Sequence, residues 1–331
     1  MRQARTLILL GACVAPSAVL ADEVFFVDSQ GNQRRRTGEI LDYRGGRVTL
    51  RSRGREISIP SLRIQRIDAE WTAPHQQGDA EFAARDYGAA LDSYLTAWKQ
   101  EHRAWVKDKL LARIIWCERN TYRIADACRN FAKLFHDDGD TPYFAAIPLA
   151  WRTGQPQGAV RQLAQGWLGS ENGSVKRLIA ASWLLSTGNR SAAMRTLRQL
   201  ADHPRQEIAG LARIQFWRTR IVSVTERDVD RWRQEVERLP GRLRAGPYFV
   251  LGQAYARIQH TDRAALAFLR VPTLFASHQG LSQAALYAAG RAVEDGGNRA
   301  EAILLYRQAV ELDADSLEGQ QAGARLTELN H

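Results

Sequence analysis

The stretch YFVLGQAYARIQHTDRAALAFLRVP, residues 248–272, decides the fold of this chain. It carries small and aromatic residues at fixed steps: a glycine, a tyrosine three positions later, an alanine twelve positions after the glycine, and a phenylalanine and a proline at steps of four. These positions are Gly252, Tyr255, Ala264, Phe268 and Pro272. The small residues predict a close crossing of two helices, and the aromatic residues predict packing against the neighbouring helix pair.

The same spacing recurs from about residue 71 to the end of the chain. Clear copies begin at Gly78 and Gly290, weaker ones begin at Ile115, Ile147 and Ala181, and one unit without the small positions falls at about 208–240. A single hairpin cannot bury its own apolar face, so successive hairpins should stack around a continuous core. The pattern therefore predicts about seven helical hairpins.

This spacing resembles that of the tetratricopeptide repeat (TPR) family. The resemblance implies a mainly α fold, a TPR-like α-solenoid over residues 71–331, whose concave groove binds peptides or helices of partner proteins. The Lys, Asn and Arg set with which the family clamps an acidic C-terminus is not recognisable, so the class of peptide stays open. The residues predicted to line the groove are Trp116, Arg119, Phe144, Trp151, Arg152, Phe249, Gln253, Arg257, Tyr287 and Arg291. Packing between hairpins is the alternative interpretation for each of them.

Residues 22–70 follow a different pattern, in which polar and apolar residues alternate. Residues 47–53 and 56–59 show this alternation clearly, and glycine-containing turns separate the runs. Such a pattern predicts four or five short antiparallel strands, which would curl into a barrel-like domain to hide their edges. The segment resembles the small SH3-like or Sm-like β modules that precede the repeats of some exported bacterial proteins.

The chain is basic, with 46 Lys and Arg against 36 Asp and Glu and a formal net charge of +10. Arginines concentrate in the predicted β domain and again in residues 190–244. Exposed arginine faces could bind phosphates or acidic glycans. The alternative is a solvated strand face that discourages pairing of strand edges. The candidate anion-binding residues are Arg34, Arg35, Arg36, Arg47, Arg51 and Arg53.

Residues 1–21 have the features of a secretory signal peptide. Arg2 and Arg5 precede a short apolar stretch, and Val19-Leu20-Ala21 is typical of a cleavage site. We expect a periplasmic or extracellular protein without a transmembrane segment after signal removal. A lipoprotein signal ending at Cys13 is the less favoured alternative, because the apolar run before it is very short.

Export would place the two remaining cysteines, Cys117 and Cys128, in an oxidising compartment. They flank residues 120–123, where two helices are predicted to turn, so they could face each other across a hairpin. A disulfide between them is one interpretation, and two buried thiols are the other.

Motifs of common enzyme classes are missing from the sequence. It has no phosphate loop ending in Gly-Lys-Ser/Thr, no His-Glu-x-x-His and no Gly-x-Ser-x-Gly. We expect no catalytic residue, no cofactor and no metal; the polar cluster at residues 136–140 is interpreted as a solvated turn. The leading hypothesis is a non-catalytic interaction scaffold in the cell envelope. The alternative is a protein that binds acidic polysaccharide, cell-wall polymer or nucleic acid through its arginine faces.

Overall fold

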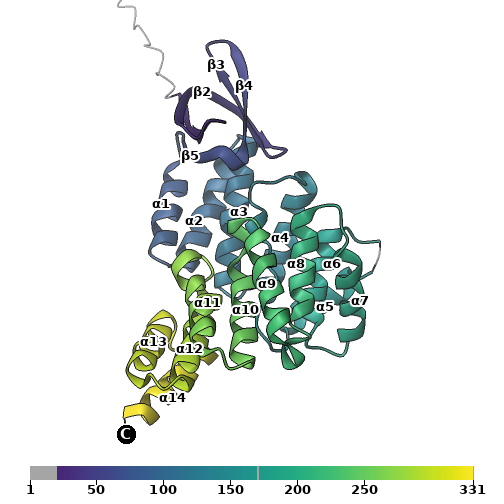
Figure 1. Ribbon diagram of the computed structural model, residues 1–331. Helices are drawn as coiled ribbons and strands as arrows, with labels where there is room; N and C mark the ends of the chain where they lie inside the picture. Colours follow the sequence, from purple (N-terminus) through teal and green to yellow (C-terminus); the bar gives the residue numbers. More distant parts are fainter. Residues whose placement is uncertain (1–20, 170, 331) are drawn as a thin grey trace, which may run out of the picture. The chain divides into compact units, whose positions relative to one another are not determined.

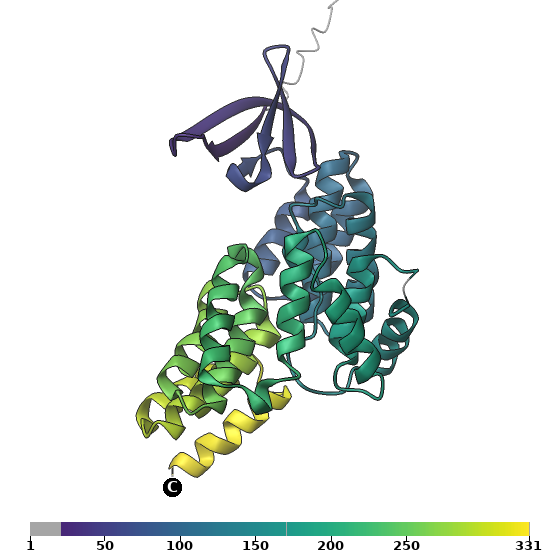
Figure 2. The same ribbon diagram turned by 45° about the vertical axis from the view of Figure 1, so that its right-hand side comes forward.

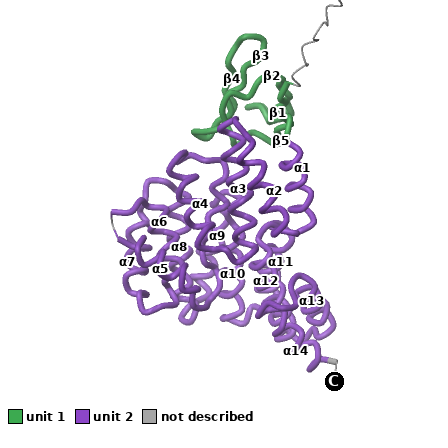
Figure 3. Tube along the Cα trace, turned by 180° about the vertical axis from the view of Figure 1, so that it is seen from behind, with its two compact units in different colours: residues 1–71 green, residues 72–331 purple. Residues whose placement is uncertain are grey.

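A computed structural model describes residues 21–169 and 171–330. The chain divides into two compact units, Met1–Trp71 and Thr72–His331 (Figure 3). The predicted signal peptide, except for its last residue, and the alternative lipidation site at Cys13 lie outside the described residues.

The first unit is an antiparallel sheet of five strands in the order β4-β3-β2-β1-β5 (Figure 1). A short 3-10 turn at Ser61–Arg63 leads into the last strand, which pairs with the first. The strands are β1 (Asp22–Val27), β2 (Gln33–Arg44), β3 (Arg47–Ser52), β4 (Arg55–Pro60) and β5 (Ile64–Asp68). The predicted antiparallel, strand-rich unit is thus confirmed.

The long strand β2 joins the two halves of this sheet. Its first part pairs with β1 up to Gly38, and its second part pairs with β3 from Glu39 onward. At Gly38 a Cβ atom would lie 2.2 Å from the carbonyl oxygen of Arg51, so only glycine permits this close approach. Alternate residues face inward, as the sequence pattern predicts. The buried apolar side chains are Val24, Ile40, Val48, Leu50 and Ile59.

The second unit is helical, with fourteen α-helices among the described residues. Consecutive helices run side by side along the unit (Figure 1 and Figure 2). They are α1 (Ala73–Ala83), α2 (Tyr87–Gln100), α3 (Ala104–Asn120), α4 (Ile124–Asp137), α5 (Gly158–Trp167), α6 (Ser174–Leu184), α7 (Arg190–Leu200), α8 (Gln206–Trp217), α9 (Glu226–Arg238), α10 (Ala245–Arg257), α11 (Thr261–Leu274), α12 (Gln279–Asp295), α13 (Arg299–Leu312) and α14 (Leu317–Asn330). The predicted mainly helical fold is confirmed.

The glycines of the repeat pattern make room for aromatic rings. A Cβ at Gly252 would lie 2.6 Å from the ring of Phe268, and a Cβ at Gly290 would lie 2.7 Å from the ring of Tyr306. In each case the ring belongs to the second helix of the same pair. The aromatic residue therefore packs within its own hairpin. It does not fill the gap to the neighbouring hairpin, although the spacing predicts this.

Six of the seven predicted helix pairs are present in the described residues. They are α1–α2, α3–α4, α6–α7, α8–α9, α10–α11 and α12–α13. The pair α8–α9, which lacks the small positions, meets through two large rings: Trp217 and Trp232 stack at 4.7 Å with an angle of 3° between their planes.

The hairpin predicted at Ile147 is wrong in its first half. A 3-10 turn (η2, Phe144–Ala146) is followed by extended chain up to α5, so no helix forms around Ile147. Pro148 and Pro156 remove backbone donors and keep the residues before them extended. Gly154, with a φ of 144°, breaks the run once more. We call residues 146–157 the internal segment.

The disulfide considered between Cys117 and Cys128 is not formed, since both cysteines are free and buried. Cys128 belongs to the main apolar cluster of the helical unit. Burial raises the pKa of both thiols to about 12, which keeps them protonated.

Candidate functional site

Side chains from neighbouring helices supply hydrogen bonds to the internal segment. The Nε1–H of Trp183, on α6, donates to the carbonyl oxygen of Pro148 at 2.9 Å. The adjacent Ser182 hydroxyl accepts from the N–H of Ala150 at 3.1 Å. These bonds satisfy buried backbone groups that have no helical partner.

Arg218, just after α8, makes the densest set of these contacts. Its Nη1 donates to the carbonyl oxygens of Ala150 at 2.8 Å and of Ser182 at 3.1 Å, and its Nη2 donates to the carbonyl oxygen of Arg152 at 2.8 Å. Gln215 adds a bond to the Ala150 carbonyl at 2.9 Å. Burial lowers the pKa of Arg218 to about 10. Within the described residues no carboxylate pairs with it, so backbone oxygens stabilise this cation.

The side chain of Trp151 anchors the internal segment to α10. The residue is 8% exposed, and its indole lies against the backbone at Gly246. A Cβ at Gly246 would lie 1.9 Å from the indole ring, so the glycine leaves the space that the ring occupies. The internal segment is therefore packed as a part of the core.

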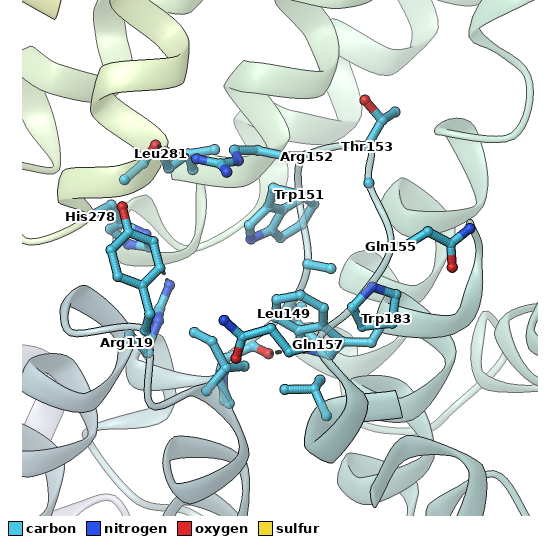
Figure 4. Close-up of a pocket in the computed structure, with 18 of the residues that line it drawn as sticks. Arg119, Leu149, Trp151, Arg152, Thr153, Gln155, Gln157, Trp183, His278 and Leu281 are labelled. Atoms are coloured by element: carbon cyan, nitrogen blue, oxygen red, sulfur yellow. Dashed lines mark hydrogen bonds between the residues drawn. The ribbon is translucent and has the colours of Figure 1, made fainter. Parts of the chain in front are cut away.

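A pocket of about 270 Å³ opens beside the internal segment. In Figure 4, Arg119 and His278 lie on one side of this pocket, Gln155 and Trp183 lie on the other, and Trp151 lies between them. The lining combines aromatic and aliphatic side chains with neutral polar groups and two arginines, and it contains no Asp or Glu. Concave, mostly apolar sites with a few convergent polar groups are typical of ligand-binding pockets.

Arg119 and His278 form the polar wall of the pocket. The Nη2 of Arg119 lies 3.2 Å from Nδ1 of His278, and its Nη1 donates to the carbonyl oxygen of Ala146 at 3.3 Å. The guanidinium also lies 4.2 Å from the ring centre of Trp116, which meets the His278 ring edge to face at 4.5 Å. Burial lowers the pKa of Arg119 to about 10. Burial, followed by the charge of Arg119, holds the pKa of His278 well below its usual range, so His278 stays neutral.

The turn between α3 and α4 closes the pocket by binding segments distant in the sequence. Asn120 donates from Nδ2 to the carbonyl oxygen of Ser277 at 2.9 Å and accepts from the N–H of Gln279 at 3.2 Å. Tyr122 donates to Asp313 at 3.3 Å. Tyr122 has a φ of 60°, a left-handed conformation that favours glycine or asparagine, and its side chain is 51% exposed. Strained backbone of this kind often occurs beside functional sites.

The structure brings together three of the ten residues predicted to line a groove. Arg119, Trp151 and Arg152 line the pocket, and Trp116 packs behind Arg119. Arg152 pairs with Glu318 at 3.2 Å and donates to the carbonyl oxygen of Gly280.

The other predicted groove residues lie elsewhere. Phe144 and Phe249 are buried against Phe131 and Phe268 at ring distances of 5.8 and 5.5 Å, and Tyr287 packs 5.8 Å from the ring of Tyr306. Gln253 is half-buried, and Arg257 and Arg291 are exposed. The repeat spacing predicts that Phe144, Trp151 and Arg152 lie on the first helix of a hairpin. This prediction is wrong, because the chain there is a 3-10 turn and the internal segment.

Several pocket residues fall outside every repeat position and are missed by the sequence analysis. They are Asn120, Tyr122, Gln157, Trp183 and His278. Most of them come from turns and from the internal segment, whose positions a helical spacing cannot give. The signal that could have found the site is the pair of prolines, 148 and 156, on either side of Trp151 and Arg152.

The candidate anion-binding arginines of the β unit are mostly engaged with neighbours. Arg34 pairs with Asp28 at 2.8 Å, Arg35 pairs with Glu23, Arg51 lies 3.3 Å from Glu39 and 3.5 Å from Glu56, and Arg47 donates to Ser58. Arg36 and Arg53 are exposed. In residues 190–244, Arg205, Arg213, Arg231, Arg242 and Arg244 also pair with carboxylates. Anion binding at these faces stays a prediction.

The described residues offer neither a metal-binding cluster nor a helix that could cross a membrane. Residues 21–169 and 171–330 contain no group of three or more His, Cys, Asp or Glu side chains that could hold a metal ion. Over the same residues, every helix is too short or too polar to cross a membrane. In the turn at 136–140, Asp137 pairs with Lys133 and Asp140 pairs with Arg205.

Comparison with known proteins gives limited similarity. No protein-family model matches this chain, and no curated protein matches it. Among solved structures, it is similar to the TPR2AB-domain:pHSP90 complex of yeast Sti1, with 13% identity over 78% of this chain and 97% of that chain and a TM-score of 0.32. It is also similar to residues 1–338 of Acl4, an assembly chaperone of RpL4, with 16% identity, the same two coverages and a TM-score of 0.31. The pocket's own geometry is therefore the basis for assigning a function.

Proposed function

We propose that this protein is a non-catalytic adaptor that binds an extended segment of a partner protein in the pocket beside the internal segment. The observation that carries the proposal is the row of alternate carbonyl oxygens, at residues 146, 148, 150 and 152, that accept hydrogen bonds from surrounding side chains. A surface of the helical unit thus has the donors that hold an extended backbone. The internal segment fills part of that surface, and the pocket is the part left open.

The pocket offers both kinds of contact that extended peptides need. Trp151 and Trp183 provide aromatic surface, which dominates the energy of many interfaces. Backbone N–H groups at Thr153 and Gln155, which line the same pocket, make no hydrogen bond within the described residues. An extended partner segment can pair with such groups as an added strand does.

We further propose that the adaptor works in the cell envelope, in the periplasm or outside the cell. This location rests on the signal-like residues 1–21. Binding of acidic polymers by the arginine faces is the alternative role. It is supported by the net charge of +10, but four of the six candidate arginines already contact neighbouring side chains.

The adaptor role is tested by selecting peptides from a displayed random library on the purified full chain. The variant Gln157→Trp fills the pocket from an exposed lining position and removes no side-chain hydrogen bond that the structure contains. Gln162→Trp, at an exposed position of α5 outside the pocket lining, is the matched control. We expect selected peptides to bind the wild type and the control equally and to lose at least about tenfold in affinity on Gln157→Trp. Selected peptides that bind all three proteins alike would contradict the proposal.

A further inference from the structure

The charge balance of the pocket points to the chemistry of a ligand. Two cations, Arg119 and Arg152, line it together with no carboxylate. Glu318, which lies outside the lining, pairs with Arg152 at 3.2 Å and neutralises it. Arg119 has no such partner within the described residues, so one positive charge of the pocket is left without a counter-charge.

Arg119 keeps unused capacity for an anion. A guanidinium carries five N–H donors, and the two acceptors of Arg119, the Ala146 carbonyl and the His278 ring, are both uncharged. A half-buried cation without a counter-ion is costly, and a carboxylate that binds to it in a fork makes strong, charge-assisted hydrogen bonds. An anionic ligand would therefore gain more here than at an exposed arginine.

The neutral ring of His278 lies beside Arg119. Because the Arg119 guanidinium can only donate, Nδ1 of His278 must accept, and the ring proton is then on Nε2. The contacts with Trp116 and Phe275 hold this ring in place. The neutral ring of His278 lines the pocket and adds no charge to it.

The rest of the pocket is suited to an apolar group. Trp151, Trp183, Leu149 and Val160 contribute aromatic and aliphatic surface. Exclusion of water by such walls strengthens an ion pair at their edge. A volume of about 270 Å³ accommodates a body the size of one aromatic ring with a short chain.

We propose that this pocket binds an organic monocarboxylate with an apolar body, in which the carboxylate pairs with Arg119 and the body lies among Trp151, Trp183 and Leu149. The carboxylate can belong to a free small acid or to an acidic side chain of a bound segment. The site stands on its own lining residues, so it does not depend on the adaptor role.

Isothermal titration of the full chain with 3-phenylpropionate tests this site. A ligand of this size should bind with a Kd on the order of 0.1–1 mM. The neutral analogue 3-phenylpropan-1-ol, of nearly the same shape, should bind at least about tenfold more weakly, because it cannot form the ion pair. This comparison uses the wild-type protein and needs no variant to fold.

Variants then locate the binding. Arg119→Gln and Gln157→Trp should each abolish detectable binding of 3-phenylpropionate. Arg299→Gln, at an exposed arginine of α13, and Gln162→Trp should leave the Kd unchanged. If Arg119→Gln does not fold, Gln157→Trp together with the wild-type comparison of acid and alcohol decides the matter.

A third arm separates the two sources of the carboxylate. The capped peptides acetyl-Leu-Glu-Leu-amide and acetyl-Leu-Gln-Leu-amide are titrated in the presence and absence of 3-phenylpropionate. Competition by the Glu peptide, without competition by the Gln peptide, supports the site and assigns it to an acidic side chain. Binding of 3-phenylpropionate that neither peptide competes for supports a small-acid site. Equal binding of the acid and the alcohol, no binding of 3-phenylpropionate and of the Glu peptide, or binding unaffected by Gln157→Trp overturns the proposal.

Discussion

The α10–α11 hairpin and the internal segment with α5 are two copies of one sequence pattern with different outcomes. In α10–α11, Gly252 makes room for the ring of Phe268, and both helices form. In the other copy the anchor position holds Ile147, a proline follows directly, and the first helix is absent. The second helix of both copies forms nevertheless.

The difference shows what the loss of one helix requires of its neighbours. Backbone groups that a helix would pair internally must be paired by side chains, and here Arg119, Trp183 and Arg218 supply the donors. As a result, Arg119 and Arg218 are cations that donate to carbonyl oxygens and have no carboxylate partner among the described residues. An extended chain is also thinner than a helix, so its replacement of a helix leaves room for the pocket.

The largest expected effect comes from removing the anchor of the internal segment. Trp151→Ala should lower the free energy of unfolding by about 3–5 kcal/mol, since it empties the space against Gly246. Chemical denaturation of the full chain measures this, with Phe268→Ala as the equivalent deletion in the α10–α11 hairpin. A loss below about 1 kcal/mol for Trp151→Ala alone would mean that the internal segment is a loose loop.

Removing the side chain of Arg218, which donates several hydrogen bonds to carbonyl oxygens, should have the next largest effect. Arg218→Met keeps most of the side-chain volume but leaves the carbonyl oxygens of Ala150 and Arg152 with fewer or no donors. We expect a loss of about 2–4 kcal/mol in the free energy of unfolding. Arg299→Met, at an exposed arginine, should change stability by less than about 0.5 kcal/mol. Equal effects of both substitutions would contradict the role given to Arg218.

Glu118, a buried acid in the α3–α4 hairpin, should make the stability of the fold depend on pH. Glu118 accepts two hydrogen bonds from Asn130, and burial raises its pKa from 4.5 to about 7. Above pH 7 the group is ionised in both states and destabilises the folded one, whereas below pH 4.5 it is protonated in both and the penalty vanishes. Lowering the pH from 8 to 5 should therefore remove most of the penalty.

Glu118→Gln should be more stable than the wild type at pH 8 by about 1–3 kcal/mol, with a difference that shrinks towards zero at pH 5. Urea unfolding of both proteins at the two pH values measures the difference directly. A constant difference across this range would show that Glu118 does not titrate as a buried acid.

The smallest expected effect compares the two glycines that make room for rings. Gly252→Ala should cost about 1 kcal/mol, because overpacking against Phe268 is partly offset by the better helix propensity of alanine. Gly246→Ala should cost more, since its Cβ would lie 1.9 Å from Trp151 instead of 2.6 Å from Phe268. Thermal unfolding ranks the two variants, and the reverse order would mean that the Trp151 ring moves easily.

Much of the fold follows from residue spacing, because helices and strands have fixed periods. The positions of Gly78, Gly252 and Gly290 locate three hairpins, and alternation in residues 47–59 locates two strands. The weak copy at Ile147 has the right spacing, but the prolines at 148 and 156 prevent its first helix.

The pocket could not be predicted in the same way. Its walls come from the α3–α4 turn, the internal segment and the loop before α12. Asn120 hydrogen-bonds to Ser277 and Gln279, which lie 157 and 159 positions further along the chain. A repeat pattern describes contacts between neighbouring hairpins, so it contains no information about such pairs. The repeat spacing predicts Arg119 and Trp151 in a groove formed by helices, and only the long-range contacts show that they share a pocket.

Amide hydrogen exchange of the internal segment, followed by NMR on the full chain, tests the central claim most directly. If the segment is a fixed part of the core, the N–H of Ala150, bonded to Ser182, should exchange at least about a hundredfold more slowly than those of Thr153 and Gln155, which have no bonded acceptor in the described residues. Exchange of Ala150 as fast as that of Thr153 would contradict the claim, since the carbonyl and amide contacts of the internal segment would then be open for most of the time.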